Sequence, residues 1–92
     1  MTSCQDVLRG LPPMPPSVQS VLCALYERQP LTGAELREAT GLPRRTVYAA
    51  LQKLKGLGVL NERGSLKDSR QSYFWLDQAA IHHAEEGAAA AA

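Results

Sequence analysis

Apolar side chains recur at helical spacing near the start of the chain. They occupy positions i, i+3, i+4 and i+7, share one face of a helix, and are Val18, Val21, Leu22 and Leu25. This stripe predicts a helix from about residue 16 or 17 to residue 27. Gln29-Pro30 follows and ends the helix, because proline cannot continue one.

Two more helices are predicted on either side of a tight turn. Thr32 and Glu35 have the spacing of a capping box, in which each side chain accepts from the backbone N–H of the other residue, so a helix starts there. It ends near Gly41, which tolerates the positive φ of a rapid reversal, and Pro43 opens the next helix, predicted over residues 43–57. The predicted buried stripe of this helix is Val47, Ala50, Leu51, Leu54 and Leu57.

The pattern then changes from helix to strand. Val59-Leu60 begins a predicted strand, residues 61–70 contain several turn residues, and residues 71–76 (QSYFWL) give the strongest strand signal in the chain. A short helix at residues 3–11 and a final helix at residues 77–86 complete the order of elements. The predicted fold class is mostly α with a small β-hairpin (α+β), arranged as a winged helix-turn-helix.

The chain is expected to divide into three parts around one small core. Residues 1–16 hold the first helix and a linker in which four of residues 12–16 are proline, which forces an extended backbone. Residues 17–76 form the winged helix-turn-helix domain. Residues 77–92 hold the last helix and an alanine tail, and they are a candidate dimerisation element. The alternative role for the linker is that of a proline-rich ligand for a recognition domain.

The two cysteines, Cys4 and Cys23, form no CxxC pair and have no histidine at zinc-ligand spacing. We expect both to be reduced, with Cys23 as a small core residue. A redox switch or an intermolecular disulfide through Cys4 is the alternative. The adjacent His82 and His83 would point about 100° apart on a helix, so they cannot readily chelate one ion. We therefore expect no metal and no other cofactor.

Charge is unevenly distributed along the chain, although the net charge is only +1. Residues 42–70 carry seven bases and two acids, a balance of +5, whereas the rest carries three bases and seven acids, a balance of −4. The bases of the positive segment are Arg44, Arg45, Lys53, Lys55, Arg63, Lys67 and Arg70. Because they coincide with the predicted helix 43–57 and the hairpin, the asymmetry favours a polyanion as partner.

The first turn of helix 43–57 is the part of a helix-turn-helix that enters the major groove, and it contains Arg44 and Arg45. The helix dipole disfavours cations at this end by roughly 0.3–1 kcal/mol, so the two arginines indicate contacts with guanine or phosphate. Tyr48 and Gln52 share the outward face. Gln52 could read adenine, and Tyr48 could contact DNA or pack at the helix edge.

Two other residues of this helix, Thr46 and Lys53, are expected to face phosphates or solvent. In the wing, Arg70 could enter the adjacent minor groove, whose negative potential attracts arginine, and Asp68 could orient the guanidinium. The alternative for that pair is a surface ion pair of little energetic value. Phosphate contacts are also expected from Arg63 and Lys67.

The run GLPRRTVYAALQKLKGLGVL followed by DSR resembles the DNA-binding lobe of the multiple-antibiotic-resistance-regulator (MarR) family of winged-helix repressors. The matching motifs are Thr46-Val47, Gly58-Val59-Leu60 and Asp68-Ser69-Arg70, and the resemblance covers about residues 17–76. It implies a wing-tip contact with the minor groove for Arg70. The groove-facing positions that it implies are Arg44, Arg45, Tyr48, Ala49 and Gln52.

Two departures from the family pattern bear on function. Ala49 stands where family members usually have a longer polar residue, so base readout is expected to be reduced. Family members also have long terminal helices that build a dimer and frame an effector pocket, and here the predicted helices 3–11 and 77–86 are short. We expect a homodimer, and whether a small-molecule effector binds is left open.

The aromatic residues Tyr73, Phe74 and Trp75 alternate across the second predicted strand, so at most two can face inward, and we expect the core to use them. The alternative is a stacking platform for single-stranded nucleic acid, which needs exposed aromatic residues among bases. No combination of nucleophile, base and orienting acid can be assembled with any specificity, so we expect no enzymatic activity.

No apolar run approaches the about 18 residues that span a bilayer, and the first residues do not form a secretory signal, so we expect a cytoplasmic protein without membrane contact. The sequence predicts a transcriptional regulator that binds double-stranded DNA specifically, with helix 43–57 in the major groove and wing 61–70 in the minor groove. The alternatives are a protein-interaction module and an architectural nucleic-acid binder with little sequence preference.

Overall fold

A computed structural model describes residues 4–64 and 72–91 of the chain, with side chains described as far as residue 87. The elements are α1 (Cys4–Arg9), α2 (Pro16–Arg28), β1 (Leu31–Thr32), α3 (Gly33–Thr40), α4 (Arg44–Gly56), β2 (Leu60–Gly64), β3 (Ser72–Leu76) and α5 (Gln78–Ala91). The described residues are thus mostly helical with one small antiparallel sheet, which confirms the predicted fold class.

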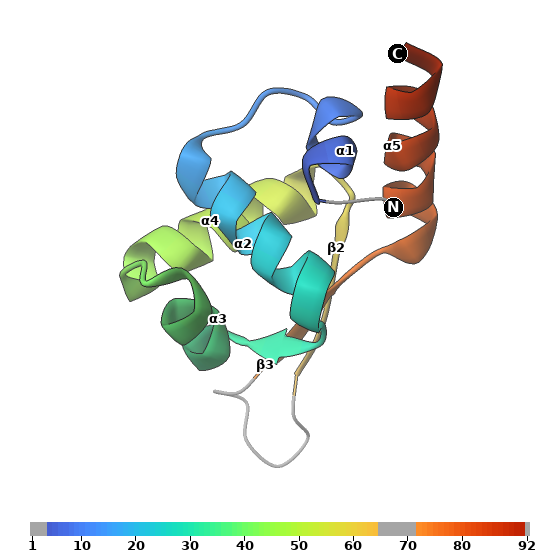
Figure 1. Cartoon of the computed structure of the whole chain (residues 1–92). Helices are drawn as coiled ribbons and strands as arrows, with labels where there is room; N and C mark the ends of the chain where they lie inside the picture. The colour runs from blue at the N-terminus through green and yellow to red at the C-terminus, as the bar shows by residue number, and fades with distance from the viewer. Residues whose placement is uncertain (1–3, 65–71, 92) are drawn as a thin grey trace.

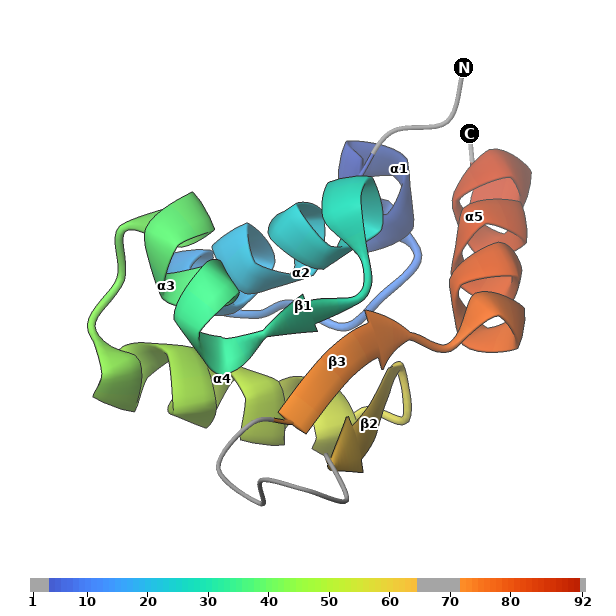
Figure 2. The ribbon, with the colours of Figure 1, turned by 90° about the horizontal axis from the view of Figure 1, so that it is seen from below.

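Helix α2 lies at the centre of the molecule, with α1 on one side and α4 on the other (Figures 1 and 2). Its predicted stripe is buried, and Val21, Leu22 and Leu25 are fully inaccessible to solvent. The stripe packs against α4, whose buried residues are Val47, Ala50, Leu51 and Leu54. Leu57 was predicted to join them, but it is the residue after the helix and is only half-buried.

The predicted capping box starts α3. The Glu35 backbone N–H donates to Thr32 Oγ1 at 3.2 Å, and the Thr32 N–H donates to Glu35 Oε1 at 3.0 Å. Gly41 ends the helix in the left-handed region, with φ of 72°, and its N–H donates to the Arg37 carbonyl at 2.8 Å. Because that cap reverses the chain within three residues, α4 begins at Arg44, beside α3.

The sheet has three strands in the order β1-β3-β2, all antiparallel. The two-residue strand β1 was not predicted, because it pairs through its backbone with Phe74 and Tyr73 and is too short to show an alternating pattern. Strand β2 extends to Gly64, into the stretch that was predicted to turn. It pairs with β3 from Leu60 opposite Leu76 to Gly64 opposite Ser72.

Of the aromatic residues of β3 that we expected the core to use, only one is fully buried. Phe74 is buried, whereas Tyr73 is 43% exposed and Trp75 is half-buried. Successive residues of a strand point to opposite faces, so a buried Phe74 directs both of its neighbours to the outer face. The core instead takes Leu76, two residues further along the same face.

The expectation that both cysteines are reduced was also wrong, since Cys4 of α1 and Cys23 of α2 form a disulfide. It joins residues 19 positions apart and brings their Cα atoms to 5.3 Å. Cys23 is only half-buried, and it is Cys4 that packs against the core. Sequence spacing did not reveal the pair, because the proline linker between the two helices sets their approach.

Helix α5 packs against α1 on one side of the molecule (Figure 1). The Asp77 carboxylate caps it by accepting from the backbone N–H groups of Ala79 and Ala80, at 3.0 and 3.3 Å. The helix continues to Ala91, five residues beyond the predicted end at residue 86, because alanine has the highest helix propensity. Within the described part of the chain, no helix has the length and hydropathy to cross a membrane.

Candidate nucleic-acid interface

The face of α4 opposite its buried stripe is polar and basic. The residues on it that were predicted to contact DNA are exposed, and they are Arg44, Arg45, Tyr48, Ala49, Gln52 and Lys53. Thr46, at the flank of this face, is half-buried. The structure therefore places these residues together on one helix surface, as the spacing along the helix predicted.

The N-terminal end of this face is suited to an anion. Pro43 precedes the helix and provides no side-chain cap, so the first backbone N–H groups of α4 are free of a capping side chain. These groups carry the positive end of the helix dipole, and Arg44 and Arg45 stand beside them. A phosphate here would meet both backbone and guanidinium donors.

Arg44 lies over the ring of Tyr48, with its guanidinium carbon 5.5 Å from the ring centroid. The two residues are four positions apart, so they are neighbours on the helix surface. Tyr48 is 37% exposed, and its hydroxyl end approaches Gly33 at the start of α3. Tyr48 therefore packs at the helix edge, as one of the two interpretations predicted, and it is also partly exposed on the basic face, so its contact with DNA stays a prediction.

The bases of this region differ in whether an acid neutralises them. Lys55 pairs with Glu62 of β2 in an exposed ion pair, which ties the end of α4 to the sheet. Four bases, by contrast, form no ion pair with any residue between 4 and 64 or between 72 and 87, and they are Arg44, Arg45, Lys53 and Arg63. Within that part of the chain, no carboxylate neutralises these four bases.

Arg63 lies on β2, directly opposite Tyr73 of β3. Both side chains are exposed on the outer face of the sheet. There they line a shallow groove of about 480 Å³ together with Trp75 and Pro30. Arg63 thus stands near the loop end of the β2–β3 hairpin, one residue before the pair Gly64–Ser72. The remaining predicted wing residues, Lys67, Asp68 and Arg70, lie outside the described residues.

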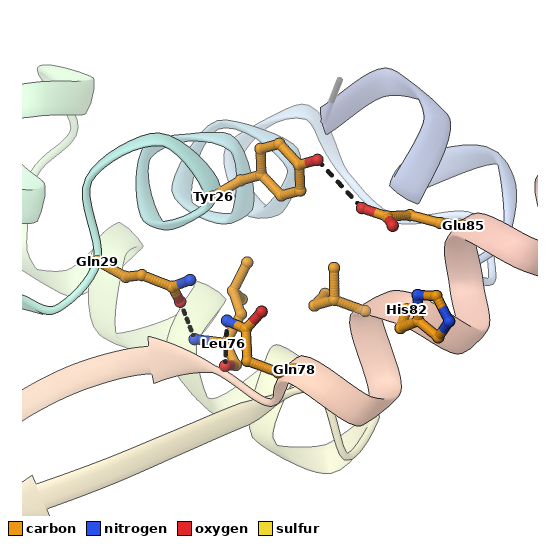
Figure 3. A pocket seen from close by; sticks show the side chains of 7 residues that line it. Tyr26, Gln29, Leu76, Gln78, His82 and Glu85 are labelled. Carbon is orange, nitrogen blue, oxygen red and sulfur yellow. Dashed lines mark hydrogen bonds between the residues drawn. The ribbon is translucent and has the colours of Figure 1, made fainter. Parts of the chain in front are cut away.

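A pocket of about 340 Å³ between α2, β3 and α5 was not predicted (Figure 3). The Tyr26 hydroxyl donates to Glu85 Oε1 at 3.1 Å, and the Leu76 backbone N–H donates to Gln29 Oε1 at 2.7 Å (Figure 3). Burial raises the pKa of Tyr26, and the hydrogen bond to Glu85 and the charge of that carboxylate raise the pKa further. No local pattern could predict this pair, because its members are 59 residues apart.

Comparison with known families identifies the class of protein that carries this face. Residues 19–74 match the family described as "Sugar-specific transcriptional regulator TrmB". The chain belongs to this family. The match runs from α2 through the helix-turn-helix to β3, so it contains the whole described basic face of α4. The family is one of transcriptional regulators. Comparison with curated proteins gave no significant match.

Solved structures share the fold. BpsR of Bordetella bronchiseptica, whose DNA binding is regulated by 6-hydroxynicotinic acid, is 20% identical with a TM-score of 0.70, over 94% of this chain and 71% of that one. MepR of S. aureus, solved with DNA, is 20% identical with a TM-score of 0.69, over 89% and 66%. ZitR of Lactococcus lactis, a zinc-responsive MarR family member, is 24% identical with a TM-score of 0.67, over 85% and 54%.

These structures confirm that the resemblance to MarR-family winged-helix regulators extends to the fold. The chain spans only about half to two thirds of the length of several of them, 54% in ZitR and 66% in MepR. The similarity covers the helix-turn-helix, the sheet and the flanking helices of this chain, since 94% of it aligns with BpsR.

Proposed function

We propose that this TrmB-family regulator binds double-stranded DNA sequence-specifically, with α4 in the major groove and the β2–β3 hairpin at the adjacent minor groove. The observation that carries the proposal is the outward face of α4, which presents exposed arginines without acidic partners among the described residues. Support comes from the family match and from MepR, a protein of the same fold that was solved as a DNA complex.

Each residue of the face has a role in this proposal. Arg44 and Arg45 contact guanine O6 and N7 or the phosphates beside the helix N-terminus. Gln52, two turns further on, contacts adenine, while Ala49 between them lets the helix approach the base edges closely and adds no hydrogen bond. Phosphate contacts come from Thr46 and Lys53, with Tyr48 at the edge of the groove.

In the wing, Arg63 and Lys67 contact phosphates, and Arg70 enters the minor groove with its guanidinium oriented by Asp68. The described part of the wing supports the first of these roles, because Arg63 is exposed and has no acidic partner among residues 4–64 and 72–87. The roles of Lys67, Asp68 and Arg70 rest on the sequence.

The proposed active form is a cytoplasmic homodimer on a site with two-fold symmetry. Residues 77–92 supply the dimerisation element, residues 17–76 bind DNA, and residues 1–16 link the two through the contact of α1 with α5. Support comes from Figure 1, where α5 lies at the periphery beside α1, away from α3 and α4. Light scattering of the purified protein measures the assembly directly.

The test of DNA binding compares variants of equal charge. A preferred duplex is selected from a random pool, and its affinity is measured by fluorescence anisotropy for the wild type, Arg44→Ala, Arg45→Ala and the control Arg9→Ala. Arg9 is exposed on α1. Helix α1 lies on the other side of α2 from α4 (Figure 2). Loss of a bidentate base contact corresponds to about a 5- to 150-fold weaker affinity, whereas Arg9→Ala should have little effect.

The outcomes separate the three functions. A regulator loses affinity for the selected duplex with Arg44→Ala or Arg45→Ala more than it loses affinity for a scrambled duplex. An architectural binder loses the same factor on both. If all four proteins bind the selected duplex with equal affinity, or if none of them binds DNA, the proposal is contradicted and a protein-interaction module is favoured.

A further inference from the structure

We propose that Gly33 is a positioning residue for the DNA-contacting guanidinium of Arg44, and that it acts through the ring of Tyr48. This inference rests on the proposed function, in which the N-terminal turn of α4 meets DNA. It follows from a chain of contacts that begins in α3 and ends at the exposed tip of α4.

The first contact is a close approach that only glycine permits. A Cβ atom at position 33 would lie 2.6 Å from Tyr48 Oη and 3.1 Å from Tyr48 Cζ. The phenol therefore occupies the space that a side chain at position 33 would fill. The φ angle of Gly33 is not positive, unlike that of Gly41, so the backbone here does not itself require glycine. Glycine is needed at position 33 because it has no side chain, which leaves room for the Tyr48 phenol.

The second contact runs from the phenol to Arg44. The guanidinium carbon lies 5.5 Å from the centroid of the Tyr48 ring, within range of a cation–π interaction. Arg44 is the first residue of α4, where the helix dipole repels a cation, and the residues between 4 and 64 or 72 and 87 offer it no carboxylate partner. The Tyr48 ring is thus the contact that, among the described residues, fixes the direction of this guanidinium.

The two contacts make the direction of Arg44 depend on the size of residue 33. Alanine at position 33 would displace the hydroxyl end of Tyr48, which is the far end of a side chain with 37% of its surface exposed. The ring can swing outward while the backbone stays in place. Alanine also has a higher helix propensity than glycine, and residue 33 is the first residue of α3. The substitution should therefore weaken DNA binding without weakening the fold.

The experiment measures the affinity of Gly33→Ala for the duplex selected by the wild type. Gly56→Ala is the matched control, because Gly56 is also helical and a Cβ there would have no neighbour within 4 Å. We expect Gly33→Ala to bind about 2- to 5-fold more weakly, the equivalent of one exposed cation–π interaction, with no loss in its urea midpoint. Gly56→Ala should bind like the wild type.

Two double variants test whether the effect passes through the proposed side chains. In an Arg44→Ala background, Gly33→Ala should have no further effect, because no guanidinium remains to be positioned. In a Gly33→Ala background, Tyr48→Phe should restore part of the affinity, because it removes the hydroxyl 2.6 Å from the added methyl group and leaves only the closer fit of the ring carbon at 3.1 Å.

The outcomes distinguish this inference from the function on which it rests. If Arg44→Ala weakens binding but Gly33→Ala does not, or does so equally with and without Arg44, the positioning role of Gly33 is wrong and the proposed function stands. If Gly33→Ala lowers the urea midpoint along with the affinity, its role is structural and the inference is again wrong. If the wild type binds no duplex, the proposed function fails and this inference fails with it.

Discussion

Reduction of the disulfide between Cys4 and Cys23 should destabilise the protein by a large share of its total stability. The bond closes a loop over a sequence separation of 19 residues. In the chain-entropy treatment, such a loop removes about 11 cal/mol/K from the unfolded chain, or about 3 kcal/mol at 25 °C. A domain of this length has a free energy of unfolding of roughly 5–14 kcal/mol, so the loss is about a fifth of it or more.

The structure also indicates which element loses most stability when the disulfide is reduced. Helix α1 has only six residues, and Val7 is its one fully buried side chain. The disulfide holds this helix against α2, and α1 in turn packs on α5. Without the bond, few apolar contacts oppose the entropy that α1 gains by leaving the surface.

Urea unfolding measures the effect, with the fluorescence of the single tryptophan, half-buried Trp75, as the signal. With a slope of about 1–3 kcal/mol/M, a loss of 3 kcal/mol lowers the midpoint by roughly 1–3 M. The variant Cys4→Ser/Cys23→Ser should have the low midpoint with or without reductant, which controls for reductant effects elsewhere. An unchanged wild-type midpoint on reduction, or two free thiols in the protein purified without reductant, would refute this reasoning.

Four further predictions concern single side chains. Thr32→Ala removes the capping box and should lower the free energy of unfolding in urea by about 1 kcal/mol. The control Ser20→Ala, at an exposed site inside α2, should not destabilise the protein. Equal urea midpoints for the two variants would contradict the role of the cap. Gly41→Ala forces alanine to a φ of 72° and should lower the free energy of unfolding by about 1 kcal/mol, while Gly56→Ala, in open space within α4, should raise it slightly. Changes of the same sign in the two variants would be contrary to this account. Folding raises the pKa of Tyr26, so the contribution of Tyr26 to the free energy of unfolding is complete below the unfolded pKa of 10.0 and is lost as pH rises through the folded pKa. Between pH ~9 and pH ~11, the wild type should therefore lose more stability than Tyr26→Phe. Parallel losses in the two proteins would be inconsistent with the raised pKa. Lys53→Ala should lower the affinity equally for all DNA sequences, and it should reduce the slope of log affinity against log salt concentration by about 1 for each protomer bound. An unchanged slope would show that Lys53 does not contact a phosphate.

The parts of the fold that sequence predicted well are those decided by local chemistry. The apolar stripe of α2, the Thr32–Glu35 cap and the left-handed Gly41 depend on residues within one or two helical turns of each other. The same holds for the exposed face of α4, because helical periodicity places Arg45 and Gln52 opposite Val47 and Leu54. For this reason the sequence alone predicts which residues of α4 share its exposed face.

The parts that sequence missed or got wrong depend on contacts between distant residues. Strand β1 exists because Leu31 finds a partner in Phe74, and the inward face of β3 is fixed by that pairing and not by the aromatic content of the strand. The Cys4–Cys23 bond depends on how the proline linker returns α2 to α1. Likewise, the approach of Gly33 to Tyr48 appears only when α3 and α4 are packed together.

The central claim, that α4 carries a DNA-binding face, is tested most directly by titrating the protein into a labelled pool of random duplexes at several salt concentrations. We predict that binding weakens linearly in a plot of log affinity against log salt, with a slope near −0.9 per neutralised phosphate, and that Arg44→Ala/Arg45→Ala lowers both affinity and slope. The absence of binding at about 50 mM salt, or a slope and affinity that the double variant leaves unchanged, would contradict the claim.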